Sequence, residues 1–210
     1  MKSIVIVGFG GFGREVAWLA KECEREVLGF LDDNAKLGKQ GPYTILGGLD
    51  SWADYSDSEF VVAIGNPRVR KQVVEKLMAR GLDAFATLVH PSVRMGENVN
   101  VGKGTMICAG CIVTVDITIG NHVILNLNVT IGHDDVIRDY VTVAPMVALS
   151  GNVILDQGVE VGTGAAIRQG IKMAEGSMLG MGGILTKETE ANTIYVGSPA
   201  KPLKQLPEFI

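Results

Sequence analysis

The chain has 210 residues, 47% of them hydrophobic, and a formal net charge of −4 at pH 7. This length suits one or two domains with a substantial core. The acidic balance argues against a polyanionic partner, so neither nucleic acid nor an anionic membrane surface is expected. Three cysteines are too few for a disulfide framework and fit a reducing compartment. No apolar segment is long enough to span a membrane, and the N-terminus lacks the regions of a secretory signal, so the expected location is cytoplasmic.

Strand and helix patterns alternate in the first part of the chain. The predicted elements are a strand at 4–7, a helix at 14–25, a strand at 27–31, a later strand at 60–64 and a helix at 68–80 that Gly81 ends. This alternation predicts a small parallel α/β domain over residues 1–82.

A glycine-rich turn joins the first strand to the first helix. Residues 8–13 read Gly-Phe-Gly-Gly-Phe-Gly, a G-x-G-x-x-G pattern in the strand–turn–helix context in which backbone amides bind phosphate. Acidic residues end the second strand about twenty residues on, as in nucleotide-binding folds. These features predict that the glycine turn binds phosphate or a nucleotide together with Asp32 and Asp33, with Gly65 and Asn66 at the same edge of the sheet. The alternatives are a turn that merely packs, and an NAD dehydrogenase, for which this α/β part is too short.

A six-residue repeat organises residues 83–188. Every sixth residue from Val89 to Leu185 is a bulky aliphatic, and the position two residues earlier is mostly small or β-branched. Residues two apart in a strand face the same side. One large and one smaller inward residue per face predict a parallel β-helix with three faces and 18 residues per coil. Glycines after the aliphatics, such as Gly102 and Gly132, are expected at corners that need a permissive backbone.

The candidate chemistry on this solenoid is at His133. It precedes Asp134 and Asp135, and a neighbouring carboxylate fixes the tautomer of an imidazole and makes it a stronger general base. The three histidines do not stack at an 18-residue period, so no metal site within one chain is expected. Asp135 falls in the inward column, where a carboxylate requires a partner or a deformed wall.

Two other polar features have structural interpretations. Cys108 and Cys111 form a C-x-x-C pattern, but the repeat places Cys111 in the inward column, where it acts as a small hydrophobe rather than a redox thiol. His122 and Asn128 are expected to make polar contacts at the corners, with a structural role.

Motifs along nearly the whole chain resemble the hexapeptide-repeat sugar acetyltransferases, the family of sialic acid O-acetyltransferases and nucleotide-4-amino-sugar N-acetyltransferases of the bacillosamine type. The motifs are the glycine turn, Gly-Phe-Leu-Asp-Asp at 29–33, Ala-Ile-Gly-Asn at 63–66, Gly-His-Asp at 132–134, Ser-Gly-Asn at 150–152 and Val-Gly-Ser-Pro-Ala-Lys at 196–201. The last lies in a C-terminal segment, residues 189–210. The resemblance implies a left-handed β-helix.

The resemblance also implies a homotrimer, with acetyl-CoA between neighbouring β-helices and a nucleotide sugar on the N-terminal domain. The residues that match the nucleotide-sugar pocket are Gly10, Gly11, Phe12, Asp32 and Asp33. His133 would be the catalytic base, Asp134 its acidic partner, and Asn126 a polar residue of the same site. The residues that match acetyl-CoA contacts are Thr142, Gly151, Thr163 and Met181. Thr163 and Met181 are 18 residues apart, as are His133 and Gly151, so each pair is expected to stack in adjacent coils.

Three positions depart from the pattern of the relatives. Phe12 replaces a histidine of many relatives, Thr142 replaces an active-site histidine of the bacillosamine type, and Met181 replaces a glycine. The leading expectation is N-acetylation of a nucleotide-linked amino sugar, with no metal. The alternatives are O-acetylation of sialic acid or another sugar, and a non-enzymatic nucleotide-sugar sensor or trimeric scaffold.

Overall fold

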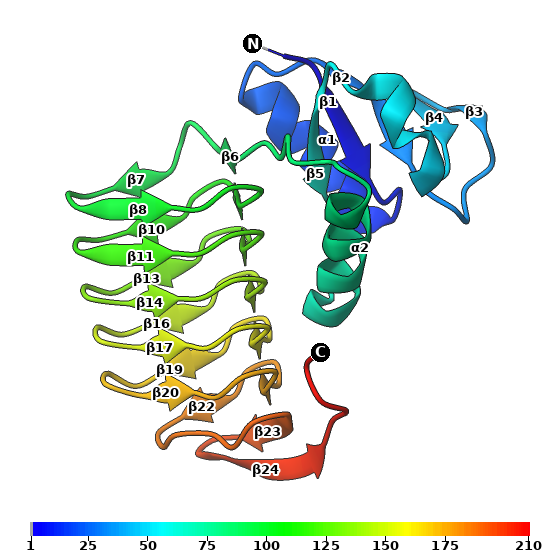
Figure 1. Cartoon of the computed structure of the whole chain (residues 1–210). Coiled ribbons are helices and arrows are strands. Elements are labelled where there is room, and N and C mark those ends of the chain that lie inside the picture. The colour runs from blue at the N-terminus through cyan, green and yellow to red at the C-terminus, as the bar shows by residue number, and fades with distance from the viewer. Residues whose placement is uncertain (1) are drawn as a thin grey trace.

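The computed structural model describes residues 2–210, which form an N-terminal α/β unit packed against the side of a β-helix (Figure 1). This arrangement confirms the predicted fold class, an α/β Rossmann-like unit followed by a left-handed parallel β-helix. Of the helices in the described residues, none combines the length and the apolar character needed to cross a membrane.

The N-terminal sheet has the strand order β3-β4-β2-β1-β5, and only β3 is antiparallel to its neighbour. Its strands are β1 (Ile4–Val7), β2 (Val27–Leu31), β3 (Gly38–Gln40), β4 (Tyr43–Gly47) and β5 (Glu59–Val62). Because β1 lies between β2 and β5, the carboxyl ends of these three parallel strands meet at one edge, where such sheets bind ligands.

Two α-helices flank this sheet, and each begins earlier than predicted. Helix α1 (Gly11–Glu22) starts inside the glycine motif, with Gly10 as its N-cap. Helix α2 (Pro67–Ala79) starts at a proline, and the Asn66 side chain caps it by accepting hydrogen bonds from two backbone amides. The β3–β4 hairpin and the 3-10 helix η1 (Leu49–Tyr55) were not predicted. These elements are short, β3 has no buried residue, and β4 and η1 have one each.

The β-helix is a prism of three sheets whose strands are parallel, except that the last two strands pair antiparallel at the end of the first sheet. The first sheet contains β6 (Leu88–Val89), β9 (Met106–Ile107), β12 (Ile124–Leu125), β15 (Thr142–Val143), β18 (Glu160–Val161), β21 (Met178–Leu179), β23 (Thr193–Gly197) and β24 (Ala200–Gln205). The second contains β7 (Arg94–Met95), β10 (Ile112–Val113), β13 (Thr130–Ile131), β16 (Ala148–Leu149), β19 (Ala166–Ile167) and β22 (Ile184–Leu185). The third contains β8 (Val99–Val101), β11 (Ile117–Ile119), β14 (Val136–Ile137), β17 (Ile154–Leu155) and β20 (Lys172–Met173).

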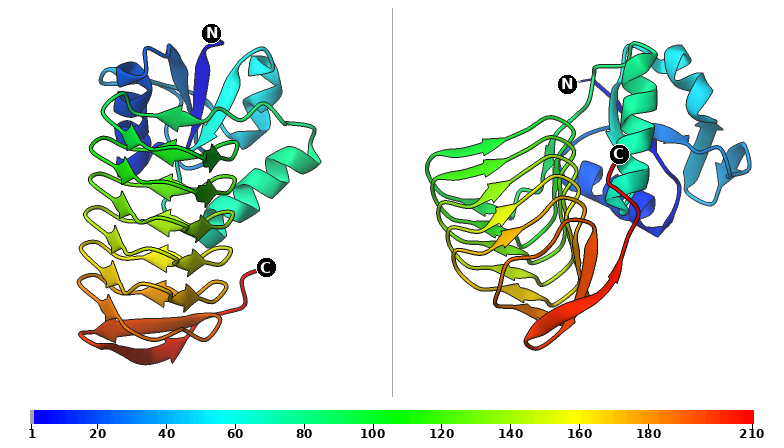
Figure 2. Two further views of the ribbon diagram at one scale, coloured as in Figure 1. Left: turned by 90° about the vertical axis from the view of Figure 1, so that its left-hand side faces the viewer. Right: turned by 60° about the horizontal axis from the view of Figure 1, so that its bottom comes forward.

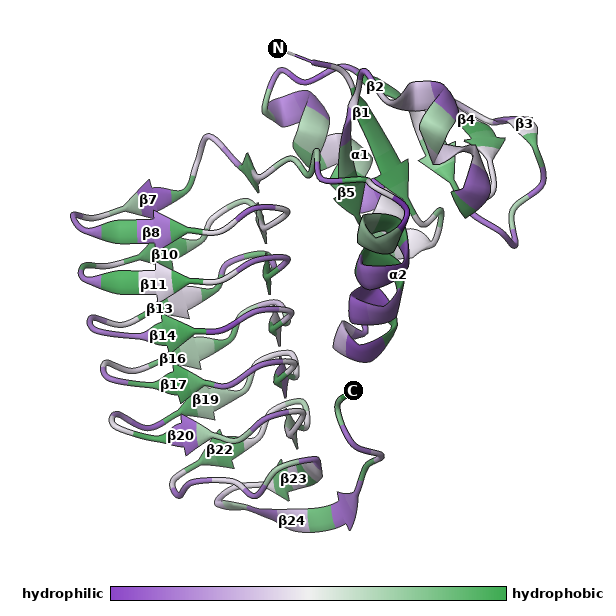
Figure 3. Ribbon diagram, in the orientation of Figure 1, coloured by the Kyte–Doolittle hydropathy of each residue, from purple (hydrophilic) through white to green (hydrophobic). Residues whose placement is uncertain are grey.

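The repeat sets both the core and the strand register. Paired residues in neighbouring coils are 18 apart, for example Ile124 with Thr142 and Thr142 with Glu160. From Ile107 onward the predicted inward columns form one buried cluster along the prism, and each buried aliphatic contributes roughly 1.5–3 kcal/mol. Val89 and Met95, at the start of the repeat, are exposed, so the prediction was wrong for these two residues. Figure 3 shows hydrophobic strands alternating with more polar turns along the solenoid.

Every sixth residue from Asn98 to Gly182 has a positive φ, which turns the backbone at the corners. The predicted corner glycines, such as Gly102 and Gly132, lie two residues earlier and are absent from this set, so that part of the prediction was wrong. Glycine is needed at these positions because neighbouring coils lie close together. A Cβ on Gly102 would lie 2.5 Å from the Gly120 backbone in the next coil.

The turns stack into three edges, which we number. Edge I joins the first sheet to the second, edge II the second to the third, and edge III the third to the first. The N-terminal unit covers the first sheet, where Met106 and Ile124 join its hydrophobic core, and α2 lies along edge III. Edge II lies at the left of Figure 1, on the side of the prism away from the N-terminal unit.

The C-terminal residues return to α2. After the β23–β24 hairpin closes the first sheet, the tail runs back along the prism, as both views of Figure 2 show. Phe209 is buried between the α2 cations Arg68 and Lys71 and the edge III residue Gly158. The Arg68 side chain also donates to the carbonyl of Glu208, so the tail ties α2 to the β-helix.

Candidate active site

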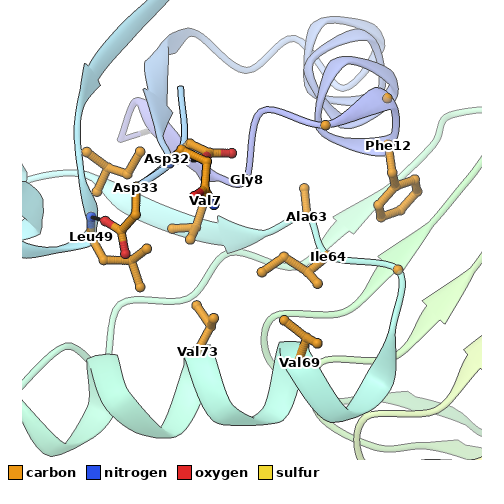
Figure 4. A pocket seen from close by; sticks show the side chains of 15 residues that line it. Val7, Gly8, Phe12, Asp32, Asp33, Leu49, Ala63, Ile64, Val69 and Val73 are labelled. Carbon is orange, nitrogen blue, oxygen red and sulfur yellow. Dashed lines mark hydrogen bonds between the residues drawn. The ribbon is translucent and has the colours of Figure 1, made fainter. Parts of the chain in front are cut away.

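A cavity of about 460 Å³ opens at the carboxyl ends of β1, β2 and β5 (Figure 4). Six of the seven residues predicted to bind a nucleotide line it: Gly10, Gly11, Phe12, Asp32, Asp33 and Gly65. The structure therefore brings together residues from three separate segments of the chain.

The glycine turn leaves an open cradle in this cavity. Gly8 has φ of 102°, and a Cβ on Gly13 would lie 2.0 Å from the Gly8 carbonyl oxygen, so protein geometry requires both glycines. Around Gly10 and Gly11, by contrast, a Cβ would meet nothing within 4 Å. The first turn of α1 has no acidic residue and no side-chain cap, so its amides and its dipole are suited to a phosphate group.

The two acidic residues differ in what they bind. Both carboxylate oxygens of Asp32 accept backbone amides, one from Phe9 (2.7 Å) and one from Asn34 (2.8 Å), which holds the glycine turn against β2. Asp33 accepts the amide of Leu49 through Oδ1 (2.7 Å). Its second oxygen is left as an acceptor for a ligand donor.

The last two predicted pocket residues also separate. Gly65 lines the cavity, whereas Asn66 caps α2 and is absent from the lining. Sequence reasoning missed Val69 and Val73, which point from α2 toward the strand ends in Figure 4. Their one-turn spacing on a helix was the available signal, because it places two apolar side chains on one face.

His133 and Asp134 form a pair on edge II. His133 Nδ1 lies 2.7 Å from Asp134 Oδ2, and both side chains are half exposed. An imidazole that donates from Nδ1 to a carboxylate presents Nε2 as a proton acceptor. The next coil leaves room for this ring, because a Cβ on Gly151 would lie 2.5 Å from Nε2. The predicted stacking of Gly151 on His133 is therefore present.

Asp135 is fully buried beneath this turn. Its Oδ1 accepts the backbone amide of Val153 (2.7 Å), which supplies the partner that the sequence required. Its Oδ2 has no hydrogen-bond partner among the described residues. Burial raises the pKa of Asp135 from 3.8 to about 7, and the backbone bonds only partly oppose this shift.

Three predicted site residues lie on edge I rather than edge II. Asn126 is half-buried there, while Thr163 and Met181 are exposed and stack in adjacent coils through the Gly182 amide and the Thr163 carbonyl (2.8 Å). The second sheet separates them from His133 and Gly151. Within one chain, the structure does not bring Asn126 and His133 together.

Thr142 lies in a different place from the other predicted acetyl-CoA contacts. It is 8% exposed, on the first sheet, and its hydroxyl donates to the Gly65 carbonyl (2.7 Å) in the contact between the two units. This buried position differs from the open surface that a contact with a cofactor arm needs.

The remaining reactive side chains have structural environments. Burial raises the pKa of the free thiols of Cys108 and Cys111 to about 12 and about 11, which disfavours the reactive thiolate. His122 is buried against Tyr140 and Phe85. Neither of its ring nitrogens has a hydrogen-bond partner among the described residues, so the polar corner contact predicted for this side chain was wrong. Within residues 2–210, no group of three His, Cys, Asp or Glu side chains lies where it could hold a metal ion.

The N-terminal unit matches a known domain family. Residues 3–77 match the model of the PglD N-terminal domain. A UDP-N-acetylbacillosamine N-acetyltransferase of Bacillus subtilis (strain 168) is 34% identical over 52% of each chain. A GDP-perosamine N-acetyltransferase of Escherichia coli O157:H7 is 30% identical over 67% of this chain and 66% of its own length. The matches thus span about half and two thirds of these relatives.

A solved structure extends the likeness to both units. The acetyltransferase domain of PglB from Neisseria gonorrhoeae FA1090, in complex with acetyl coenzyme A, superposes with a TM-score of 0.88 at 27% identity, over 96% of this chain and 99% of that chain. This likeness covers both the N-terminal unit and the β-helix, so the described chain has the architecture of the hexapeptide-repeat class. The chain belongs to the family of hexapeptide-repeat sugar acetyltransferases that carry a PglD-type N-terminal domain.

Proposed function

We propose that the protein transfers the acetyl group of acetyl-CoA to the amine of a nucleotide-linked amino sugar. The observation that carries this proposal is the combination of an open phosphate cradle at Gly10 and Gly11 with an accessible His133–Asp134 pair. The relatives named for UDP- and GDP-linked amino sugars support the acceptor class, and the PglB domain with acetyl coenzyme A supports the donor.

The nucleotide sugar occupies the cavity of the N-terminal unit. Its diphosphate accepts hydrogen bonds from the amides at Gly11 and Phe12, where the positive end of the α1 dipole adds to the attraction. Asp33 accepts a donor of the nucleoside through its second oxygen. Val69 and Val73 supply the apolar wall against which a flat base packs.

His133 acts as the general base. The amine nitrogen attacks the thioester carbonyl, Nε2 takes the proton that the nitrogen loses, and backbone amides near Gly151 stabilise the oxyanion. The carbon–sulfur bond then breaks, and the departing CoA thiolate takes the proton back from the imidazolium. Asp134 holds the ring and stabilises its charged form. The transfer is direct, so no serine or cysteine nucleophile takes part.

A homotrimer completes this site. His133 and Gly151 lie on edge II, whereas Asn126, Thr163 and Met181 lie on edge I. These two edges flank the second sheet, whose outward side chains include the exposed Ile112, Thr130 and Ala148. If three copies pack around an axis with these sheets inward, edge I of one copy meets edge II of the next. Asn126 of one copy then approaches His133 of its neighbour, and the pocket of one copy serves the base of another.

Acetyl-CoA binds in the groove between neighbouring copies. Gly151 contributes from edge II, and Thr163 and Met181 contribute from edge I of the adjacent copy. Met181 is exposed, and a contact with CoA through its main-chain atoms does not depend on the glycine that relatives have there. Thr142 takes no part in this groove, since its hydroxyl is used within the chain.

The test is release of CoA thiol from acetyl-CoA in the presence of UDP-, GDP- and dTDP-linked 4-amino sugars, with free sialic acid alongside and mass spectrometry of each product. We expect one nucleotide sugar to gain an acetyl group on nitrogen. Acetylation of sialic acid alone would establish O-transfer instead. Binding of UDP or GDP without any binding of acetyl-CoA would favour a sensor.

A further inference from the structure

Arg70 is a fully buried cation where α2 meets edge III of the β-helix. Its guanidinium bonds only to backbone carbonyls. They are those of Ile64 (2.6 Å), Gly65 (3.0 Å), His122 (2.9 Å), Tyr140 (2.6 Å) and Val141 (3.2 Å). The first two belong to the segment that lines the nucleotide pocket, and the other three belong to two successive coils of the solenoid. One side chain therefore joins the pocket to the β-helix.

Thr142 makes a second connection at the same place. Its hydroxyl donates to the Gly65 carbonyl (2.7 Å), the same oxygen that accepts from Arg70. The pocket residue Gly65 is thus held by one donor from α2 and one from the first sheet. We call this arrangement of Arg70, Thr142 and the Gly65 carbonyl the clasp.

The chemistry of the clasp suits an orienting role. The Arg70 side chain forms no ion pair within 4 Å in the described chain. The half-buried Glu160, which pairs with Thr142 in the next coil, favours the charged form of Arg70 electrostatically. A planar guanidinium can address carbonyls in several fixed directions at once, which a lysine ammonium on a flexible stem cannot do. The geometry of the contact is therefore specified more tightly than apolar packing alone would specify it.

We propose that Arg70, supported by Thr142, is a positioning residue that fixes the nucleotide pocket at a set orientation to the β-helix. This inference rests on the proposed function. A sugar held in the pocket has to present its amine to the base of a neighbouring copy, and the packing of the two β-helices places that base relative to the solenoid to which the clasp fixes the pocket. Misplacement by about 1 Å costs about 100-fold in rate. The clasp thus controls the transfer step rather than nucleotide affinity.

The experiment compares Thr142→Val, Thr142→Ser and Arg70→Lys with the full-length wild type. It measures kcat, both KM values, thermal melting and the binding of UDP and GDP by calorimetry. We expect Thr142→Val to lower kcat about 10-fold and Arg70→Lys about 100-fold, with nucleotide affinity and the KM for acetyl-CoA within about twofold. Thr142→Ser keeps the hydroxyl and restores kcat. Thr118→Val is the matched control, because Thr118 is exposed on the third sheet.

Each contrary result has a definite meaning. Variants that melt earlier but keep wild-type kcat at a temperature well below melting would show a purely structural clasp and overturn the inference. Weakened UDP and GDP binding at unchanged kcat would overturn it too, because the clasp would then shape the pocket itself. If the wild type acetylates no nucleotide amino sugar, the proposed function fails and this inference fails with it. Since Thr142→Val removes only one hydroxyl bond, it keeps the test valid if Arg70→Lys does not fold.

Discussion

Gly151 lies so close to His133 that a methyl group on its α-carbon would be 2.5 Å from the imidazole Nε2. The contact crosses from one coil to the next, and the bond from the Asn152 amide to the His133 carbonyl (2.8 Å) fixes it. The absence of a side chain at Gly151 is therefore what lets the half-exposed imidazole take this position.

Gly151→Ala should therefore reduce turnover without unfolding the protein. The half-exposed ring can rotate away from the added methyl, so the backbone is spared while Nε2 leaves its position. We expect kcat to fall about 100-fold, the loss that a misplaced reacting group causes, with little change in the melting temperature. A variant with wild-type kcat would show that the position of Nε2 is unimportant.

Asp134→Asn tests the carboxylate with the backbone unchanged. Asp134 has φ of 61°, and asparagine tolerates this conformation as well as aspartate does. Because the amide cannot stabilise an imidazolium by charge, we expect kcat to fall by about 10- to 100-fold, within the usual contribution of acid–base catalysis. Both KM values should stay near those of the wild type. His133→Asn should remove most turnover, and equal activity in both variants would contradict the division of roles.

Asp135→Asn should change how stability depends on pH. In the unfolded chain this carboxyl ionises near pH 4, but the buried group ionises only near pH 7. The native state thus binds more protons between these values, so stability falls as pH rises from 4 to 7. A shift of about three units corresponds to on the order of 4 kcal/mol. Urea unfolding at pH 5 and pH 8 should show that the free energy of unfolding of the variant rises relative to that of the wild type as pH rises. The same difference at both pH values would contradict this.

Asp32→Asn and Asp33→Asn should separate support of the pocket from contact with the ligand. Both Asp32 oxygens accept backbone amides, so an amide nitrogen there faces another donor and costs about 1–3 kcal/mol of stability. Asp33 can keep its bond to Leu49 through Oδ1 as asparagine. We expect the second variant to melt normally and to bind UDP or GDP about 10-fold less tightly. Calorimetry and thermal melting check both, and indistinguishable variants would remove the distinction.

The sequence predicted the features that depend on local pattern. The repeat fixed the core columns and the 18-residue stacking, and the glycine motif with Asp32 and Asp33 located the pocket. Residues that act through distant contacts were not predictable in this way. From the sequence alone, Arg70 is expected to be an exposed charge on a helix. It is buried only because α2 packs against edge III. Thr142 has an outward position in the repeat, and the repeat pattern does not predict that the N-terminal unit covers it.

The repeat in the sequence is sufficient to predict that Asn126 and His133 lie on different edges. The two positions differ by seven residues, which is one strand and one corner in a six-residue repeat, so they belong to neighbouring edges. Their meeting in one site therefore needs a second copy of the chain.

Because each coil has 18 residues, two independent quantities define where a residue of the solenoid lies. One is its height along the axis, and the other is the edge or face on which it lies. Loss or gain of a whole coil would change the height of every later residue and leave its edge unchanged. Loss of a single hexapeptide would keep the interior columns continuous, yet it would rotate Thr163 and Met181 by a third of a turn, onto a different edge. Variation in the length of such a chain is thus expected in steps of three repeats between the histidine and these two residues, because intermediate steps would disrupt the proposed acetyl-CoA groove while leaving the core intact.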